Sequence, residues 1–335
     1  MSIRTVRSIS SIALAAVHVH VLVAVVIVIV VAQSTAFAQA YPAKPVRMFV
    51  ASTPGGYVDR TSRLVADKLS QRMGQSFVLE NRAGAGGNIA GKATAESVPD
   101  GYTLLGTAAQ IAVNASLYKD PGFNLITDLV PVGIAGGTPG VFAVHPSNPA
   151  KNLRELIQNA KGKRLTHGSG IGTSSHVAAD YLFRILAKLD AEHVPFKGGA
   201  PALAAVLGNQ VEVLNSSTGS VLPHARSGKL KPLGIAGPKR DAALPDVMTV
   251  AEQGYPGFAE ISWIAFFAPS KLPSPILNRL NNEINQVLVL PDINKALVEL
   301  GMDVTPWQPA IIAEYVRSEL VTWTRIVKET GVTVD

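Results

Sequence analysis

The sequence predicts an α/β fold built on parallel strands. Short apolar segments alternate with segments whose apolar residues recur at helical spacing, and this alternation continues through nearly the whole chain after residue 40. Turns rich in glycine separate many of these segments. The chain has 335 residues, of which 47% are hydrophobic. It is therefore long enough for about two domains and can bury a large core.

The first forty residues are predicted to be an export signal. Arg4 and Arg7 precede an apolar run over residues 12–32, and small residues in an A-x-A pattern follow up to Ala40. This order is typical of a secretory signal peptide, and we expect cleavage before Tyr41. The run is longer than the roughly 7–15 apolar residues of a usual signal. An uncleaved membrane anchor is therefore the alternative, and either form places the remaining chain outside the inner membrane.

In the first part of the chain, short apolar runs predict strands over residues 46–51, 77–80 and 102–107. A helix is predicted from about Asp59, because the apolar residues after it recur at helical spacing. A second helix is predicted over residues 88–97, between a glycine-rich turn and a Pro-Asp-Gly turn.

The rest of the chain repeats the alternation. Residues 129–135 and 141–145 are predicted to be a strand pair that crosses between two lobes, and residues 262–268 a further crossing strand. A long helix is expected to be capped by Ser174 or Ser175. The remaining predicted elements are a helix at 153–161, strands at 165–169, 211–214 and 230–235, a helix after 197–200, and mostly helix over 276–328.

The composition excludes several kinds of site. The chain has no cysteine, which rules out disulfides, thiolate metal sites, a cysteine nucleophile and a lipid anchor after the signal. Once residues 1–40 are removed, 28 basic residues remain beside 24 acidic ones, and the basic residues are scattered. We therefore expect no nucleic-acid binding. The histidines after residue 40 lack the close spacing of metal ligands, so we expect no metal and no other cofactor.

Four turns rich in glycine or small residues carry the candidate binding site. They cover residues 53–57, 84–88, 168–175 and 197–200, and each joins a strand to the start of a helix. In open α/β sheets such turns lie at the carboxyl ends of the strands, where ligands bind. Each exposes unpaired backbone N–H groups at the positive end of a helix dipole, so several around one cleft would hold a carboxylate. The alternative is that glycine serves only the tight turns.

The enzyme motifs are incomplete. The P-loop-like segment from Gly86 to Lys92 is followed by Ala93, where a hydroxyl should bind magnesium. His167 occupies the first position of the nearest candidate for a nucleophile elbow, around Ser169. His176 is expected in the first turn of a helix rather than as a general base. We therefore expect no catalytic residue; the enzyme alternative is an exported hydrolase that uses a serine near His176.

Seven short motifs occur in an order that is known from one family. They are Pro42 to Pro45, Pro54-Gly55-Gly56 with Asp59, Glu80-Asn81-Arg82 with Gly84 to Asn88, Pro99-Asp100-Gly101-Tyr102, Gly172-Thr173-Ser174-Ser175-His176, His193-Val194-Pro195-Phe196-Lys197-Gly198, and Leu244-Pro245-Asp246-Val247. Together they resemble the Bug family, the extracytoplasmic substrate-binding receptors of tripartite tricarboxylate transporters. The resemblance covers the chain from Tyr41 to its end.

The resemblance implies a two-lobed periplasmic binding protein of type II (Venus-flytrap), an α/β fold with a ligand cleft between the lobes. Residues 41–140 and 264–335 would form lobe 1, and residues 141–263 would form lobe 2. The ligands of the family are mostly carboxylates, including dicarboxylic, tricarboxylic and aromatic acids and acidic amino acids. The implied protein is a monomeric receptor for the permease subunits of a tripartite tricarboxylate transporter. The alternative is a receptor that signals to a membrane sensor kinase.

The resemblance also implies which residues bind the ligand. They are Thr53, Gly55, Gly56, Tyr57, Asp59, Thr107, Gln110, Gly170, Thr173, Ser174, Ser175, Lys197, Ser216 and Ser217. For Asp59 the alternative is a cap on its own helix. Tyr57 stands where the family commonly has a small residue, and it would either contact the ligand or only cover the turn. The residues from Asn215 to Thr218 lack the acid that is common there and add hydroxyl groups, which favours an anionic ligand over an amine.

Overall fold

The computed structural model describes residues 41–334. From Lys44 onward these residues form one compact unit, to which all the helices and strands named below belong. The predicted signal peptide, residues 1–40, lies outside the described residues, so its cleavage stays a prediction. Within residues 41–334, no helix is both long and apolar enough to cross a bilayer.

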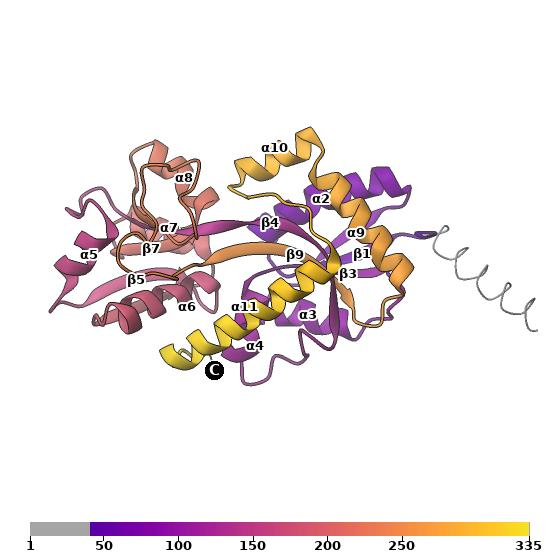
Figure 1. The fold of residues 1–335 in the computed structure, drawn as a ribbon, viewed down its shortest axis with the longest axis horizontal. Helices are drawn as coiled ribbons and strands as arrows, with labels where there is room; N and C mark the ends of the chain where they lie inside the picture. The colour runs from indigo at the N-terminus through magenta and orange to yellow at the C-terminus, as the bar shows by residue number, and fades with distance from the viewer. Residues whose placement is uncertain (1–40, 335) are drawn as a thin grey trace, which may run out of the picture. The chain divides into compact units, whose positions relative to one another are not determined.

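Nine strands in the described part of the chain form one mixed sheet (Figure 1). They are β1 (Val46–Val50), β2 (Phe77–Asn81), β3 (Thr103–Ala108), β4 (Leu129–Val144), β5 (Leu165–Gly170), β6 (Ala191–Phe196), β7 (Val213–Ser217), β8 (Lys231–Ile235) and β9 (Ile261–Pro269). Their order is β2-β1-β3-β9-β4-β7-β5-β6, and β8 also pairs with β4. β1 is parallel to β2 and β3, and β5 is parallel to β6 and β7, which confirms the predicted α/β fold.

Strand β4 joins the two lobes of the fold. Its first part, residues 129–139, pairs with β9, and its last part, residues 140–144, pairs with β7 and β8. We call the part around β1 to β3 lobe 1 and the part around β5 to β8 lobe 2. Their exact boundaries, 41–140 with 264–335 against 141–263, stay a prediction.

The two strands expected at 129–135 and 141–145 are a single strand, which corrects the sequence analysis. Glycine and proline between them predicted an interruption, because both residues are unfavourable inside strands. The structure instead shifts the register against β9 between Pro131 and Gly133 and between Ile134 and Gly136. The second irregularity accommodates Gly136, while Gly137 and Pro139 pair with β9 in register and Gly140 pairs with β7. The strand therefore continues across both lobes.

Helices cover both faces of the sheet. They are α2 (Tyr57–Met73), α3 (Asn88–Ala95), α4 (Gln110–Leu117), α5 (Leu153–Ala160), α6 (Ser174–Asp180), α7 (Gly199–Leu207), α8 (Thr218–Arg226), α9 (Ser274–Leu288), α10 (Pro291–Glu299) and α11 (Pro309–Thr330), with the 3-10 helix η1 (Ala85–Gly87) and the π-helix η2 (Tyr181–Leu186), which continues α6. In lobe 1, α2, α9 and α10 lie on one side of the strands and α3 and α4 on the other (Figure 1). The predicted helical region 276–328 is thus three helices, and α4 and α8 were missed.

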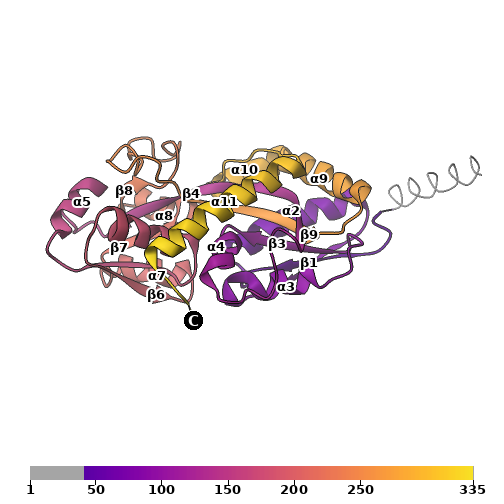
Figure 2. The ribbon, with the colours of Figure 1, turned by 60° about the horizontal axis from the view of Figure 1, so that its bottom comes forward.

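The C-terminal helix α11 lies across the strands that join the lobes (Figures 1 and 2). It contacts α4 and β4 as well as α6 and η2 of lobe 2. Its Glu319 Oε2 accepts hydrogen bonds from the indole N–H of Trp263 at 3.0 Å and of Trp323 at 3.2 Å. Both indoles are buried. The bond from Trp263 joins α11 to strand β9, whereas Trp323 belongs to α11 itself and holds the Glu319 side chain in place.

Candidate functional site

The turn between β1 and α2 is held by Asp59. Asp59 Oδ2 accepts the Gly55 N–H at 2.8 Å, and the two carboxylate oxygens bind the Arg63 guanidinium at 3.0 Å. Asn81 Nδ2 adds a bond of 2.8 Å to Oδ1. Burial raises the pKa of Asp59, but these donors outweigh burial, and the pKa lies below its usual value. Because α2 begins at Tyr57, Asp59 lies in its first turn and does not occupy the cap position.

Three turns of lobe 1 meet at the ends of β1 and β3. A Cβ added to Gly87, in the 84–88 turn, would lie 3.1 Å from Ala51 Cβ and 3.7 Å from Thr107 Oγ1. Only glycine permits this approach, because the φ angle of Gly87 is +102°. Gln110 begins α4 directly after this meeting point. The structure therefore brings Thr107 next to the 84–88 turn. That Thr107 and Gln110 face the ligand stays a prediction.

Two hydroxyl groups at this end of lobe 1 are buried without a partner. Thr107 Oγ1 and the Tyr57 hydroxyl have no hydrogen-bond acceptor or donor within residues 41–334. Burial raises the pKa of Tyr57, so its phenol keeps its proton. Buried hydroxyl groups normally find a partner, and each of these can donate a hydrogen bond to an anion.

In lobe 2, Thr173 caps helix α6. Its Oγ1 accepts the His176 N–H at 3.2 Å and donates to the Gly170 carbonyl at 2.7 Å. The expected cap at Ser174 or Ser175 is wrong by one residue, since Thr173 has the extended backbone of a cap and Ser174 begins the helix. The sequence analysis could not separate three adjacent hydroxyl residues that all favour this position.

The other predicted residues of lobe 2 surround the same turn. A Cβ added to Gly170 would lie 3.0 Å from Gly198 Cα, and one added to Gly199 would lie 3.7 Å from Ser216 Oγ. Lys197 is exposed beside this contact, and Ser217 Oγ lies 3.0 Å from Ser220 Oγ. The predicted residues therefore form two groups, one at the strand ends of each lobe.

The turn of lobe 2 that covers residues 168–175 reaches lobe 1 at Gly172. A Cβ added to Gly172 would lie 3.7 Å from Leu117 Cδ2, from Tyr118 Oη and from Val334 Cγ1. The first two atoms belong to the end of α4, the helix that begins at Gln110. The 168–175 turn of lobe 2 thus meets the C-terminal end of α4, whose N-terminus carries Gln110. That the two groups of predicted residues face one ligand stays a prediction.

Three histidines and one aspartate form a cluster beside this turn. His167 Nε2 lies 2.9 Å from Asp180 Oδ1, and His176 Nε2 lies 3.6 Å from Asp180 Oδ2. The rings of His176 and His193 stack with centroids 3.6 Å apart. The Gly172 N–H donates to His176 Nδ1 at 3.3 Å. The cluster therefore supports the backbone of the 168–175 turn.

The geometry does not favour the hydrolase alternative. Ser174 Oγ donates to Glu260 at 2.7 Å rather than to a histidine. Ser169 Oγ does lie 2.9 Å from His193 Nε2, but Ser169 is only 1% exposed. In the described part of the chain, no group of three or more histidine, aspartate and glutamate side chains is placed to hold a metal ion.

The histidine cluster predicts a pH effect on stability. Burial lowers the pKa of His176 to about 4, whereas an unfolded histidine titrates near pH 6.5, so unfolding takes up a proton between these values. Relative to His176→Gln, whose amide oxygen can still accept from Gly172, the wild type should lose about 1.4 kcal/mol of stability per pH unit on acidification. Thermal unfolding of both proteins measures this difference. A constant difference would contradict the expectation.

The sequence analysis missed Glu260. This residue is 1% exposed and directly precedes β9. Burial raises its pKa to about 7; the Ser174 hydroxyl opposes the rise and Glu319 adds to it. The available signal was a single acid between the apolar residues Phe258 and Trp263. Only the fold shows that this acid lies beside Ser174.

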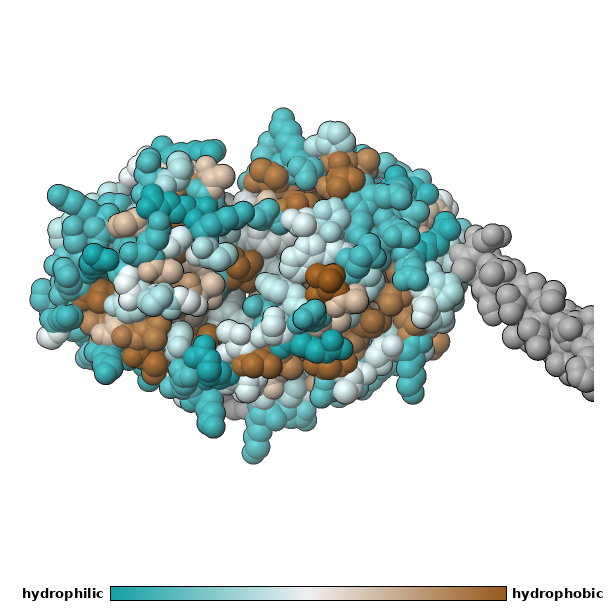
Figure 3. All heavy atoms as spheres, in the orientation of Figure 1, coloured by the Kyte–Doolittle hydropathy of each residue, from teal (hydrophilic) through white to brown (hydrophobic). Residues whose placement is uncertain are grey.

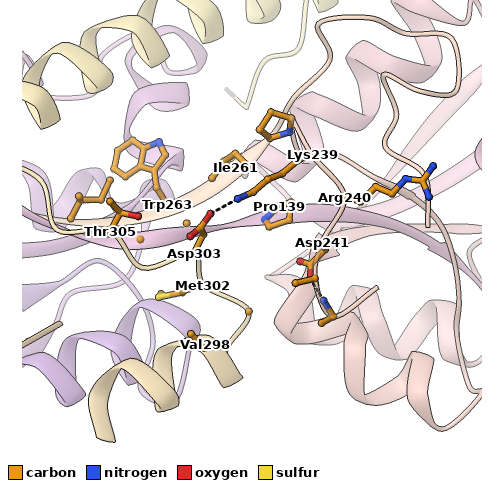
Figure 4. A pocket seen from close by; sticks show the side chains of 18 of the residues that line it. Pro139, Lys239, Arg240, Asp241, Ile261, Trp263, Val298, Met302, Asp303 and Thr305 are labelled. Carbon is orange, nitrogen blue, oxygen red and sulfur yellow. Dashed lines mark hydrogen bonds and ion pairs between the residues drawn. The ribbon is translucent and has the colours of Figure 1, made fainter. Parts of the chain in front are cut away.

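A separate cavity of about 720 Å³ lies where β4 and β9 pass between the lobes (Figure 4). Its wall includes Pro139, Ile261 and Trp263, and Lys239 of lobe 2 reaches Asp303 at 3.1 Å across its mouth. It is lined by none of the residues predicted to bind the ligand. On the face shown in Figure 3, hydrophilic residues dominate and apolar residues form smaller patches between them.

Comparisons with known proteins agree with this architecture. Residues 61–332 match the family model described as the tripartite tricarboxylate transporter family receptor. Protein BugT of Bordetella pertussis is 35% identical over 299 residues, which cover 88% of this chain and 91% of BugT. The structure of Rhodopseudomonas palustris Rpa4515 with adipate has a TM-score of 0.80 at 30% identity and covers 88% of this chain and 99% of that one. MatC of the same organism with bound malate has a TM-score of 0.77 at 30% identity, covering 86% and 100%.

Proposed function

The chain belongs to the family of tripartite tricarboxylate transporter receptors, which are periplasmic solute-binding receptors and not enzymes, and from this premise we propose that it captures a small carboxylate and delivers it to the permease subunits of such a transporter. The two solved structures with adipate and malate support a carboxylate as ligand. We further propose that the signal is cleaved before Tyr41 and that the mature receptor is a monomer.

The observation that carries this proposal is the set of donors at the strand ends. In lobe 1, the Thr107 and Tyr57 hydroxyl groups are buried without partners among the described residues. In lobe 2, the turn from Gly170 to Ser175 opens into the N-terminus of α6, whose dipole and N–H groups favour a negative charge. We propose that one carboxylate contacts both groups of predicted residues, and that the lobes close because the ligand binds both only in the closed form.

A thermal-shift screen against dicarboxylates, tricarboxylates, acidic amino acids and aromatic acids tests the ligand class. A ligand at about 100 times its Kd should add roughly 2.7 kcal/mol to stability, which is a readily measured shift. Amines and uncharged sugars are the comparison set. If they alone raise the unfolding temperature, the carboxylate proposal is wrong.

Replacement of Thr107 with valine should weaken carboxylate binding about tenfold without lowering stability, since the removed hydroxyl is buried and donates to nothing in the described chain. Valine has nearly the shape of threonine, so lobe 1 should keep its packing. Isothermal titration with malate and adipate measures the affinity, and thermal unfolding measures the stability.

The matched control is Thr94→Val. Thr94 is equally buried in lobe 1, but its Oγ1 donates to the Ala90 carbonyl at 2.9 Å. This change should lower stability by about 1 kcal/mol and leave the affinity as it was. If the two variants bind with equal affinity, the Thr107 hydroxyl does not contact the ligand.

A further inference from the structure

Glu260 is a buried acid at the junction of both lobes. Its backbone N–H donates to the Ala236 carbonyl at 2.6 Å, and its carbonyl accepts the Gly140 N–H at 3.1 Å. These bonds fix it between β4 and the segment after β8, one residue before β9 begins. Its side chain is directed at the binding turn of lobe 2, because Ser174 Oγ donates to its Oε1 at 2.7 Å.

The other carboxyl oxygen of Glu260 and a second acceptor, the side-chain oxygen of Asn215, both lie beside Gly140. A Cβ built on Gly140 would overlap Glu260 Oε2 and would lie 3.0 Å from Asn215 Oδ1. Both oxygens are buried and have no hydrogen-bond donor within the described residues. Asn215 Nδ2 donates to the Ser175 carbonyl at 2.9 Å, which commits the amide nitrogen to α6 and leaves its oxygen on the side of Glu260.

A proton on Glu260 would provide the hydrogen-bond donor that these two buried oxygens lack. Neither acceptor has a donor among the described residues, and a neutral carboxyl group would supply an O–H from Oε2 that Asn215 Oδ1 can accept. A carboxylate would add a buried charge, which is costly without a cation. The charged group that acts on Glu260 from a neighbouring helix is Glu319 of α11, a second acid, while α6 offers only the hydroxyl groups of Ser174 and Ser175.

We propose that Glu260 controls anion binding through its proton: the neutral acid completes the binding turn, and the ionised acid weakens the binding of an anionic ligand. This inference rests on the proposed function, because it concerns the same turn. Ionisation places a negative charge next to Ser174 and removes the donor that Asn215 requires. Burial raises the pKa of Glu260 to about 7, so the change falls in the range where this receptor would bind its ligand.

Linkage makes the proposal measurable. If the anion prefers the neutral acid, the anion must in turn favour its protonation, and binding above the pKa takes up a proton. Between about pH 6 and about pH 8, the affinity of the wild type should therefore fall about tenfold. The same linkage predicts an uptake of close to one proton per ligand at the higher pH.

The experiment is isothermal titration with malate and with adipate, in pairs of buffers that differ in ionisation heat. At about pH 8 the carboxyl groups of these probes are ionised in solution, so they do not contribute the proton taken up at that pH. Glu260→Gln, which keeps one acceptor for Ser174 and a donor for Asn215, should bind with the same affinity at both pH values and take up no proton. Glu319→Gln is the matched control and should retain the uptake.

Two results would overturn the proposal. One is binding by the wild type with neither proton uptake nor loss of affinity at the higher pH. The other is a proton uptake that survives in Glu260→Gln or disappears in Glu319→Gln. The proton uptake of the wild type can be measured even if neither variant folds.

If neither probe binds at any pH, the proposed function fails for these acids, and Glu260 is tested without ligand. A folded-state pKa above the unfolded value stabilises the protein at low pH, and this contribution is lost as the pH rises through the folded pKa. The stability of the wild type relative to Glu260→Gln should then fall between about pH 5 and about pH 8. If the difference in stability stays constant over this range, Glu260 is not a neutral acid with a raised pKa in the folded protein.

Discussion

Replacement of Asp180 with alanine should lower the free energy of unfolding by about 1–3 kcal/mol, which is the usual cost of leaving a buried hydrogen-bonding group without its partner. Asp180 is 3% exposed and accepts from His167 Nε2 at 2.9 Å, while Arg184 lies at 3.4 Å and His176 at 3.6 Å. Burial raises the pKa of Asp180, but His167, His176 and Arg184 outweigh burial, so it is charged at neutral pH.

The loss is large because His167 is fully buried and cannot form a hydrogen bond with water in place of the one with Asp180. His167 is 0% exposed, and its Nδ1 already lacks a partner in the described chain. Without Asp180 the Nε2 atom also loses its partner, and one more unsatisfied buried atom costs about 1–3 kcal/mol. Asp180→Asn keeps one acceptor and should lose about half as much.

Chemical denaturation of the two variants measures the effect, with Asp292→Ala as the matched control. Asp292 also holds a cation, Lys68 at 2.7 Å, but its side chain is 60% exposed. Exposed pairs contribute about 0–1 kcal/mol, so this control should unfold almost as the wild type does. If Asp180→Ala and Asp292→Ala cost the same, the histidine cluster does not support the fold.

The parts of the molecule that could be predicted from the sequence are those set by local chemistry. Apolar periodicity located most of the strands and helices, and the glycine-rich turns fell between the predicted strands and helices because glycine is required where a strand turns sharply into a helix. The two strands expected within residues 129–145 were wrong for the opposite reason. There, pairing with β9 on one side overrode the local preference of glycine and proline.

The buried polar contacts could not be predicted, because they join residues that are distant in the sequence. Glu260 reaches Ser174 across 86 positions, and Asn215 reaches Ser175 across 40. Asn215 was considered only as part of a cleft-facing segment that lacks a common acid, which favoured an anionic ligand. The structure places another acid, Glu260, next to it. The preference for an anion then depends on whether that acid keeps its proton, which no local pattern records.

Replacement of Gly170 with valine should reduce carboxylate affinity more than about a hundredfold, because the change separates the two strand ends that present the binding turns. Gly170 ends β5, and a Cβ there would lie 3.0 Å from Gly198 Cα on β6's turn and 3.0 Å from Thr173 Cγ2. A backbone atom limits the space on one side and the cap of α6 on the other. Valine would displace both, along with the N–H groups between them.

The matched control is Gly199→Ala, whose Cβ would meet Ser216 Oγ at an ordinary 3.7 Å. It adds a methyl group to the same turn without moving the backbone, so it should change the affinity far less than Gly170→Val does. Isothermal titration with malate and adipate gives the affinities, and circular dichroism confirms that Gly170→Val is folded, since overpacking costs about 1–3 kcal/mol. Unchanged binding by folded Gly170→Val would mean that the ligand is held elsewhere. The close approach of the turns at Gly170 and Gly198 would then serve only the packing of lobe 2.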